Sequence, residues 1–167
     1  MVMRADVLAA SLDAALNEGD MRPRLLLSPR GSAFTQACAR GLAAAEGIVL
    51  VCGRFEGVDE RIISARRLKE ISIGDYVLSG GEIAAMAICD ACVRLLPGVI
   101  GNANSNAEES FEAGLLEYPH YTRPREWEGR QIPEILLSGD HAKIKSWRLA
   151  EAQRITRERR PDLLKRV

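Results

Sequence analysis

Two glycine-rich segments, each following an apolar run, are the residues of this sequence best suited to bind a ligand. The first runs from Ile48 to Arg61 and the second from Ser72 to Glu82. Glycines between a strand and a helix expose backbone N–H and C=O groups, because little side chain stands in the way. Together the segments predict one pocket built from loop backbone at neighbouring strand ends. Either segment alone is better explained as an ordinary connection, and neither contains a P-loop or a G-x-G-x-x-G motif, so phosphate cradling is not the leading explanation.

A long polar segment, residues 101 to 134, holds the other residues capable of chemistry. It contains the acids Glu108 and Glu109, and later a dense run of prolines, aromatic residues and charges over residues 114–124. A loop of this length in a compact domain is usually functional or disordered. Its leucine and aromatic content favours an ordered loop over a site. From residue types alone, the two acids are solvent-facing loop residues and Arg94 is a surface base at the end of a helix.

Composition excludes several broad classes of protein. The chain has 167 residues, enough for one domain, with 23 basic and 23 acidic residues and no net charge. Zero net charge argues against a protein that coats nucleic acid by bulk electrostatics, although it is compatible with a local basic patch. The sequence has no bilayer-spanning apolar run and no signal-peptide pattern, which predicts a cytoplasmic location and no membrane partner. Its four cysteines are expected to be packed free thiols, because the lone C-x-x-C at Cys89 and Cys92 lacks a second ligand pair for zinc.

Apolar periodicity predicts helices that alternate with strands. The expected helices cover residues 6–17, 35–46, 58–66, 82–96 and 140–157, the last one capped by Asp140. The expected strands cover residues 24–27, 48–52 and 70–73, with 76–78 as an alternative extension and a short strand before the last helix. This order indicates a mostly parallel α/β sheet, in which ligands bind outside the carboxyl ends of the strands. Basic residues of the last helix are explained by a solvated face, and a phosphate-contacting surface is the alternative.

The chain resembles the TrmD family of bacterial tRNA (guanine-N1)-methyltransferases, of the SPOUT class. The motifs that carry the resemblance occur in order across nearly the whole chain: Leu27-Ser28-Pro29-x-Gly31, Leu50 to Arg61, Ser72 to Glu82, Gly114 to Pro124, Leu136 to Ile144 and Arg159 to Leu163. The resemblance implies a SPOUT-type parallel sheet flanked by helices, with a C-terminal trefoil knot, which is an exception to unknotted topology. It also implies a cofactor-binding α/β knot domain over residues 1–138 and the start of a tRNA-binding helical region over residues 139–167.

The cofactor implied by the resemblance is S-adenosylmethionine, bound largely by backbone groups of three loops. The residues that would line its site are Leu26, Leu27, Ser28, Pro29, Gly53, Phe55, Glu56, Gly57, Ile73, Gly74, Asp75, Tyr76, Val77, Leu78, Gly80 and Gly81. Two positions depart from the usual family pattern. Phe55 replaces a tyrosine and Ala84 replaces a proline, and both changes concern the shape of the pocket more than its chemistry.

The reaction implied by the resemblance is methyl transfer to N1 of the guanine immediately 3′ of the tRNA anticodon. This reaction needs a base for the N1 proton and a cation for the charge that develops on O6. By position these are Glu109 and Arg94, although Glu109 replaces an aspartate and its reach is about one methylene longer. Glu108 is the alternative base. The residues expected to position the guanine are Ser110, Glu117, Tyr118, His120, Tyr121 and Arg123, with a purely structural role as the alternative for His120 and for His141.

The resemblance further implies a homodimer whose active site takes residues from both subunits, and a dependence on magnesium, for which the sequence shows no motif. Met1 to Met3 align with the interior of the family domain, and the resemblance implies a chain shortened at both ends relative to the family. This predicts that the segment alone folds poorly and has little activity, which circular dichroism and gel filtration would test. Two other functions remain open: an inactive cofactor-binding or dimerisation fragment, and a SPOUT-class enzyme that methylates ribose 2′-hydroxyls of RNA.

Overall fold

Helices and strands alternate through the first hundred residues of the chain, as the sequence predicts. The computed structural model describes residues 1–100, 109–111 and 113–165. These residues belong to two compact units, Met1–Gly101 and Asn102–Val167. The boundary expected after residue 138 separates a cofactor-binding region from an RNA-binding region, and it stays a prediction.

A parallel sheet of three strands forms the centre of the first unit. Its order is β2 (Val49–Cys52), β1 (Arg24–Ala33) and β3 (Lys69–Ser72), and the strand pairs place Leu25 opposite Leu50 and opposite Lys69. Both neighbours of β1 run parallel to it. Each of the connections between successive strands contains a helix, as parallel strands require. The predicted parallel α/β sheet is therefore confirmed.

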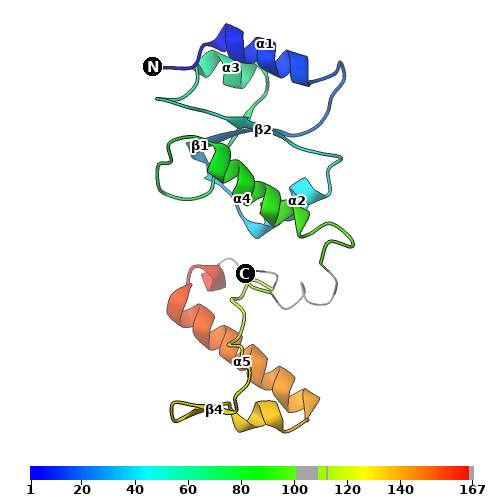
Figure 1. Cartoon of the computed structure of the whole chain (residues 1–167), viewed down its shortest axis with the longest axis vertical. Coiled ribbons are helices and arrows are strands. Elements are labelled where there is room, and N and C mark those ends of the chain that lie inside the picture. The colour runs from blue at the N-terminus through cyan, green and yellow to red at the C-terminus, as the bar shows by residue number, and fades with distance from the viewer. Residues whose placement is uncertain (101–108, 112, 166–167) are drawn as a thin grey trace. The chain divides into compact units, whose positions relative to one another are not determined.

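The helices cover both faces of this sheet (Figure 1). Helices α1 (Ala5–Ala15) and α3 (Glu60–Ala65) pack on one face, where Leu12 and Ile62 meet Leu26 of β1. Helices α2 (Gln36–Ala43) and α4 (Glu82–Val93) pack on the other face, where Ile88 meets Leu25 and Leu27. Because successive side chains of a strand point to opposite faces, the run of leucines in β1 supplies both cores.

Strand β1 is longer than predicted and pairs with β3 in two registers. Leu25 to Leu27 pair with Lys69 to Ile71, and after an irregularity Ser32 and Ala33 pair with Ile71 and Ser72. The sequence predicts that the strand ends at residue 27, because Pro29 and Gly31 normally mark a turn. A Cβ atom added to Gly31 would lie 2.2 Å from the backbone nitrogen of Ile71. Glycine at this position thus allows the chain to return to the sheet.

The second unit is built on one long helix, α5 (His141–Arg159). Asp140 caps it by accepting a hydrogen bond from the backbone N–H of Lys143 at 3.1 Å, which confirms the predicted cap. The other elements of the described part of this unit are a hairpin of two-residue strands, β4 (Glu126–Trp127) and β5 (Arg130–Gln131), and the 3₁₀ helices η2 (Glu134–Leu137) and η3 (Leu163–Lys165).

Two predictions for short strands are wrong. Residues 76–78 form no strand. The short strand expected before the last helix is instead η2, which follows Pro133, and the carbonyl of Pro133 accepts a hydrogen bond from Leu136 at 3.0 Å. Proline fixes its own φ near the helical value, and this favours a turn at the point where a strand was expected.

The sequence did not predict the hairpin of β4 and β5. It turns at Glu128 and Gly129, whose φ angles of 50° and 73° fit a two-residue hairpin loop.

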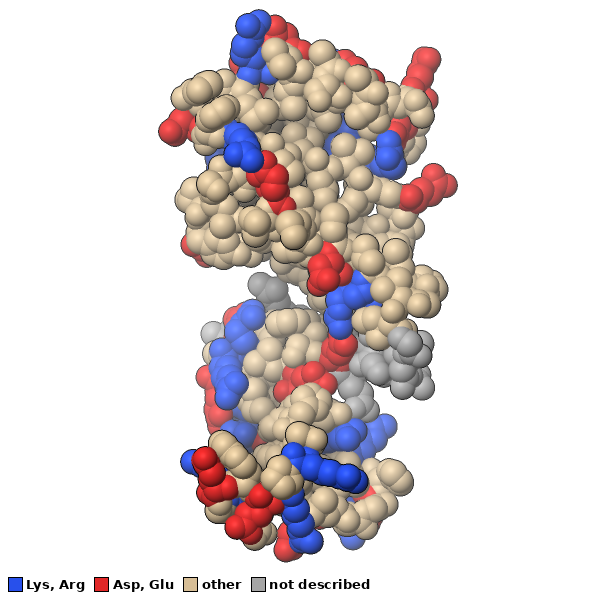
Figure 2. All heavy atoms as spheres, in the orientation of Figure 1, with Lys and Arg blue, Asp and Glu red and all other residues tan. Residues whose placement is uncertain are grey.

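Charged side chains of both signs are interspersed on the face of the molecule drawn in Figure 2. Ion pairs form within each unit, such as Arg66 with Asp13 in the first unit and Arg154 with Glu151 and Glu158 in the second. Among the helices that the structure describes, none is both long enough and apolar enough to cross a lipid bilayer.

Candidate functional site

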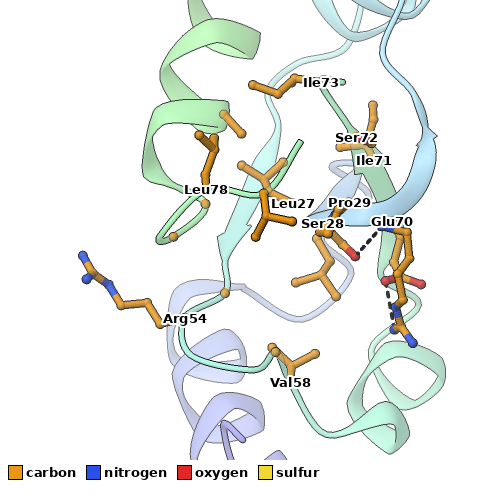
Figure 3. A pocket seen from close by; sticks show the side chains of 18 of the residues that line it. Leu27, Ser28, Pro29, Arg54, Val58, Glu70, Ile71, Ser72, Ile73 and Leu78 are labelled. Atoms are coloured by element: carbon orange, nitrogen blue, oxygen red, sulfur yellow. Dashed lines mark hydrogen bonds and ion pairs between the residues drawn. The ribbon is translucent and has the colours of Figure 1, made fainter. Parts of the chain in front are cut away.

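A cavity of about 360 Å³ opens at the carboxyl ends of the three parallel strands (Figure 3). Three segments line it: the irregular middle of β1, the loop after β2, and the end of β3 with the loop that leads to α4. Ligands of open α/β sheets bind at this edge. All the predicted cofactor residues line the cavity except Asp75. Ala84, expected to affect the shape of the pocket, also lines the cavity. Further lining residues, which sequence reasoning did not assign to the site, are Arg30, Arg54, Val58, Glu70, Ile71, Ser72 and Ser79.

The first wall is the part of β1 that leaves the regular ladder. Leu27 lies against the cavity next to Ser28, whose hydroxyl accepts a hydrogen bond from the backbone N–H of Arg30 at 3.2 Å. The Arg30 guanidinium bonds the carboxylates of Glu60 and Glu70, each at 3.0 Å. Arg30 therefore ties this wall to α3 and to β3. The position of Arg30 inside the Leu27-to-Gly31 motif could have indicated that it lies at the site. Nothing in the sequence indicated that Glu60 and Glu70 would be its partners.

The second wall is the loop from Gly53 to Gly57. Phe55 adopts a left-handed backbone, with φ of 60°, and its side chain is 64% exposed. Such a conformation is uncommon for a residue with a Cβ atom and tends to occur at binding sites. Backbone hydrogen bonds attach this loop to the N-terminal residues. The N–H of Met3 donates to the Gly57 carbonyl at 2.9 Å, and the Met3 carbonyl accepts from the Asp59 N–H at 3.0 Å.

The third wall runs from Ser72 to Gly81. The nearly buried Ser72 hydroxyl donates to the carbonyl of Gly74 at 3.0 Å and accepts from its N–H at 3.2 Å, which fixes the first turn of the loop. Further along, the N–H of Gly81 donates to the carbonyl of Gly53 at 3.1 Å. A Cβ atom on Gly81 would lie 2.8 Å from the Cα atom of Cys52. The second and third walls therefore meet through glycine backbone.

An ion pair spans the same two walls on their outer side. Arg54 bonds Glu82, the first residue of α4, with 2.8 Å between the charged groups, and its side chain points away from the cavity (Figure 3). Bonding to its own backbone N–H, and then to Arg54, lowers the pKa of Glu82. Glu82 thus stays ionised at neutral pH, and its charge near the N-terminus of α4 is favourable.

The two predicted catalytic residues lie in different units. Arg94 is the C-cap residue of α4 in the first unit, and its backbone N–H donates to the carbonyl of Asp90 at 3.1 Å. Glu109 is a half-buried residue at the start of the described part of the second unit. The alternative base, Glu108, lies outside the described residues.

Most of the predicted guanine-positioning residues cluster within the second unit. The Ser110 hydroxyl accepts a hydrogen bond from the Glu117 N–H at 3.0 Å, and the Glu117 carboxylate pairs with Nε2 of His120 at 2.9 Å. The ring of Tyr118 lies 5.1 Å from the His120 ring, and the Arg148 guanidinium lies 4.7 Å from the Tyr118 ring centroid. Tyr121 contacts Trp147 at 6.3 Å between ring centroids, and Arg123 is exposed.

No group of three or more His, Cys, Asp or Glu side chains among the described residues could hold a metal ion. The four cysteines are free thiols. Burial raises the pKa of Cys52 and of Cys92, whereas hydrogen bonding to Thr35 lowers the pKa of Cys38.

An α/β unit with a glycine-lined cavity at the carboxyl ends of parallel strands belongs to the class of small-molecule-binding α/β domains. The family model for tRNA (Guanine-1)-methyltransferase TrmD matches residues 1–166, and the chain belongs to this family.

Three relatives illustrate the similarity, each named tRNA (guanine-N(1)-)-methyltransferase. The protein of Rhodopseudomonas palustris (strain HaA2) is 68% identical over 163 residues, which are 98% of this chain and 64% of that protein. The protein of Mesorhizobium japonicum is 65% identical over 98% of this chain and 71% of its own length. The protein of Rhizobium johnstonii is 64% identical over 100% of this chain and 68% of its own length. The chain thus spans about two thirds of these relatives.

Proposed function

We propose that this chain carries the methyl-donor site and the catalytic residues of a tRNA (guanine-N1)-methyltransferase. The product would be a guanine methylated at N1, at the position 3′ of the anticodon. The observation that carries the proposal is the cavity at the strand ends, because the family's motif residues from three separate segments line it. The names of the relatives supply the reaction class.

The cavity has the properties expected of a site for S-adenosylmethionine. Its volume of about 360 Å³ falls within the usual range for small-molecule sites. Leu26, Leu27, Ile73 and Leu78 provide apolar walls, and Gly53, Gly80 and Gly81 line the cavity with backbone that carries no side chain. When bound, S-adenosylmethionine supplies an electrophilic methyl group. The loops would hold the donor by main-chain bonds, as glycine-rich junctions do.

Within this proposal Glu109 removes the N1 proton of guanine and Arg94 stabilises the charge that develops on O6. A base must come within about 2.6–3.2 Å of the proton's heavy atom, and a fixed cation beside developing charge lowers the barrier. Glu117, His120, Tyr121 and Arg123 would then contact the guanine or its neighbours, since an extruded base is held by stacking and by bonds to its edge.

A homodimer with a shared active site fits the surface of α4. Ile83, Met86 and Val93 of this helix are 61%, 67% and 47% exposed, although they are apolar. Such a stripe is typical of a surface that another chain covers. The trefoil knot, the cytoplasmic location and the RNA-binding role of residues 139–167 stay predictions from the family. No cluster of three His, Cys, Asp or Glu side chains among the described residues marks a magnesium site, and no step is assigned to the ion.

Calorimetry with S-adenosylmethionine and a methylation assay on tRNA transcripts test the proposal together. One transcript carries guanine 3′ of the anticodon and its control carries adenine there. We expect binding of the donor, and label on the base of the first transcript alone. Binding without turnover would favour a cofactor-binding fragment, and label on ribose would favour a 2′-hydroxyl methyltransferase.

Glu109→Gln tests the role of the proposed base. We expect turnover to fall by roughly 10²- to 10⁴-fold, because the amide cannot accept the proton, while the dissociation constant of S-adenosylmethionine stays nearly the same. The matched control is Glu128→Gln, which removes an exposed acid of the β4–β5 turn that pairs with Arg130. Equal activities of the two variants would exclude Glu109 as the base.

A further inference from the structure

Thr156 is a fully buried residue of α5, with an exposed fraction of 0%. Its hydroxyl donates a hydrogen bond to the carbonyl of Ala152 at 2.7 Å, one turn earlier in the helix. The same oxygen accepts a hydrogen bond from the backbone N–H of Leu116 at 2.8 Å, forty residues away in the chain. A threonine that bonds only its own helix satisfies its donor and nothing else. The bond to Leu116 therefore gives this hydroxyl a second role.

The segment that Thr156 holds, called the Ser110–Glu117 loop, is described at residues 110, 111 and 113–117. The N–H of Phe111 donates to the carbonyl of Leu115 at 2.7 Å. The N–H of Glu117 donates to the Ser110 hydroxyl at 3.0 Å, which joins the two ends of the loop. Leu116 is the chain neighbour of Leu115 and Glu117, so its attachment to α5 also fixes the residues that these two bonds join.

A second contact attaches the same loop near the end of α5. The Arg160 guanidinium lies 5.8 Å from the centroid of the Phe111 ring, and the Arg160 N–H donates to the carbonyl of Thr156 at 2.8 Å. Phe111 has a left-handed backbone, with φ of 75°, which neighbouring structure must maintain. The Leu116–Thr156 hydrogen bond and the Arg160–Phe111 contact thus join the end of α5 to the loop that directly follows Glu109.

We propose that Thr156 is a positioning residue: its hydroxyl fixes the Ser110–Glu117 loop and thereby the carboxylate of Glu109. This inference depends on the proposed function, in which Glu109 is the base. Proton transfer is sensitive to small displacements, and a misplacement of about 1 Å can reduce a rate by about 10²-fold. Because Thr156 does not line the donor cavity, its loss affects turnover and leaves donor affinity unchanged.

Thr156→Val, Thr156→Ser and Ser146→Ala test the proposal in the full chain. Valine keeps the shape of threonine but cannot accept the Leu116 hydrogen bond, whereas serine can. Ser146→Ala is the matched control, because the Ser146 hydroxyl donates to the carbonyl of Ala142, one turn earlier in the same helix, just as the Thr156 hydroxyl donates to Ala152. For Thr156→Val we expect kcat on tRNA to fall by roughly 10- to 100-fold, with an unchanged dissociation constant for S-adenosylmethionine. Thr156→Ser should recover most of the rate, and Ser146→Ala should match the unaltered chain.

Hydrogen exchange at the Leu116 amide gives a readout that does not require activity. We expect this amide to be protected in the unaltered chain and in Thr156→Ser. It should exchange as fast as an exposed loop amide in Thr156→Val. Full activity of a folded Thr156→Val, or rapid exchange of Leu116 in the unaltered chain, would overturn the proposal. If the unaltered chain transfers no methyl group, the proposed function fails, and the exchange rate of Leu116 still decides whether Thr156 holds the loop.

Discussion

At the scale of single residues, the close contact between Gly81 and the end of β2 requires glycine at position 81. Gly81 has an ordinary helical backbone, with φ of −78° and ψ of −9°, so alanine is excluded by space and not by conformation. Its Cβ atom would lie 2.8 Å from the Cα atom of Cys52, closer than such atoms approach. We expect Gly81→Ala to lower the free energy of unfolding by about 1–3 kcal/mol and to weaken binding of S-adenosylmethionine. Urea unfolding and calorimetry measure the two effects.

Gly41→Ala is the control for this substitution. Gly41 lies in α2, and a Cβ atom there would meet nothing within 4 Å. Alanine should raise the free energy of unfolding by up to about 1 kcal/mol, because it restricts the unfolded chain and favours helix. If Gly81→Ala bound the donor as tightly as Gly41→Ala does, the close contact would have no role in shaping the cavity.

Sequence reasoning recovered the glycine-rich part of the site, because glycine spacing at strand ends is a local pattern. Gly53, Gly80 and Gly81 were identifiable in this way, and the structure brings them to one cavity. The bonds of Arg30 to Glu60 and Glu70 were not identifiable, since they join residues 30 and 40 positions apart. The hydroxyl of Thr156 was missed for the same reason.

At the scale of secondary-structure elements, α4 presents two isoleucines to different surroundings. Ile88 is fully buried in the core under the sheet, whereas Ile83 is 61% exposed. We expect Ile88→Ala to lower the free energy of unfolding by about 2–5 kcal/mol, because it leaves a cavity. Ile83→Ala should change the free energy of unfolding of the monomer by at most about 0.5 kcal/mol. Urea unfolding at low protein concentration measures the free energy of unfolding of both variants.

The same pair of variants separates folding from self-association. Sedimentation should show weaker association for Ile83→Ala, because its side chain belongs to the exposed stripe proposed as the dimer face. An equal loss of folding stability in both variants would contradict the arrangement of α4.

Elements with clear periodicity were predicted to within a few residues. The helix expected over residues 82–96 is α4, and the strand expected over residues 48–52 is β2. The second register of β1 was missed because Pro29 and Gly31 normally end a strand, whereas here the chain leaves the sheet and returns. Helix η2 was missed because a short apolar run does not distinguish a strand from a turn of helix.

At the scale of the whole molecule, surface ion pairs make stability depend on pH. Bonding to Arg22 holds the pKa of Asp20 at about 2, and bonding to Arg61 holds the pKa of Asp59 at about 2. Both values lie below the ordinary value of 3.8, so the folded state binds these protons less readily than the unfolded state. Their stabilising effect is complete above about pH 4 and is lost as the pH falls towards 2.

Melting temperatures measured between pH 5 and pH 2 test this dependence. We expect a steady fall below about pH 4, and a shallower one for Asp59→Asn, because asparagine still caps α3 but does not titrate. Added salt should weaken the effect, since exposed pairs are screened. A melting temperature that is constant over this range would show that these aspartates are not perturbed.

The division into two units was not predictable from local pattern. The sequence suggested that residues 101–134 form a loop over the site of one domain, whereas the structure assigns the chain from Asn102 onward to a unit of its own. Family membership was predictable, because six motifs in a fixed order are far more specific than any one of them. A knot has no local signature, since it depends on how distant segments pass one another.

Backbone forms much of the walls of the strand-end cavity, including the main-chain contact between Gly53 and Gly81, and this affects the design of inhibitors. A competitive inhibitor that bonds peptide groups there would offer few single substitutions through which resistance could arise. Side-chain replacement leaves a peptide N–H in place, and proline, the one residue that removes it, would break the turn that carries it. Escape would require a change in loop shape, which would impair binding of the natural ligand as well.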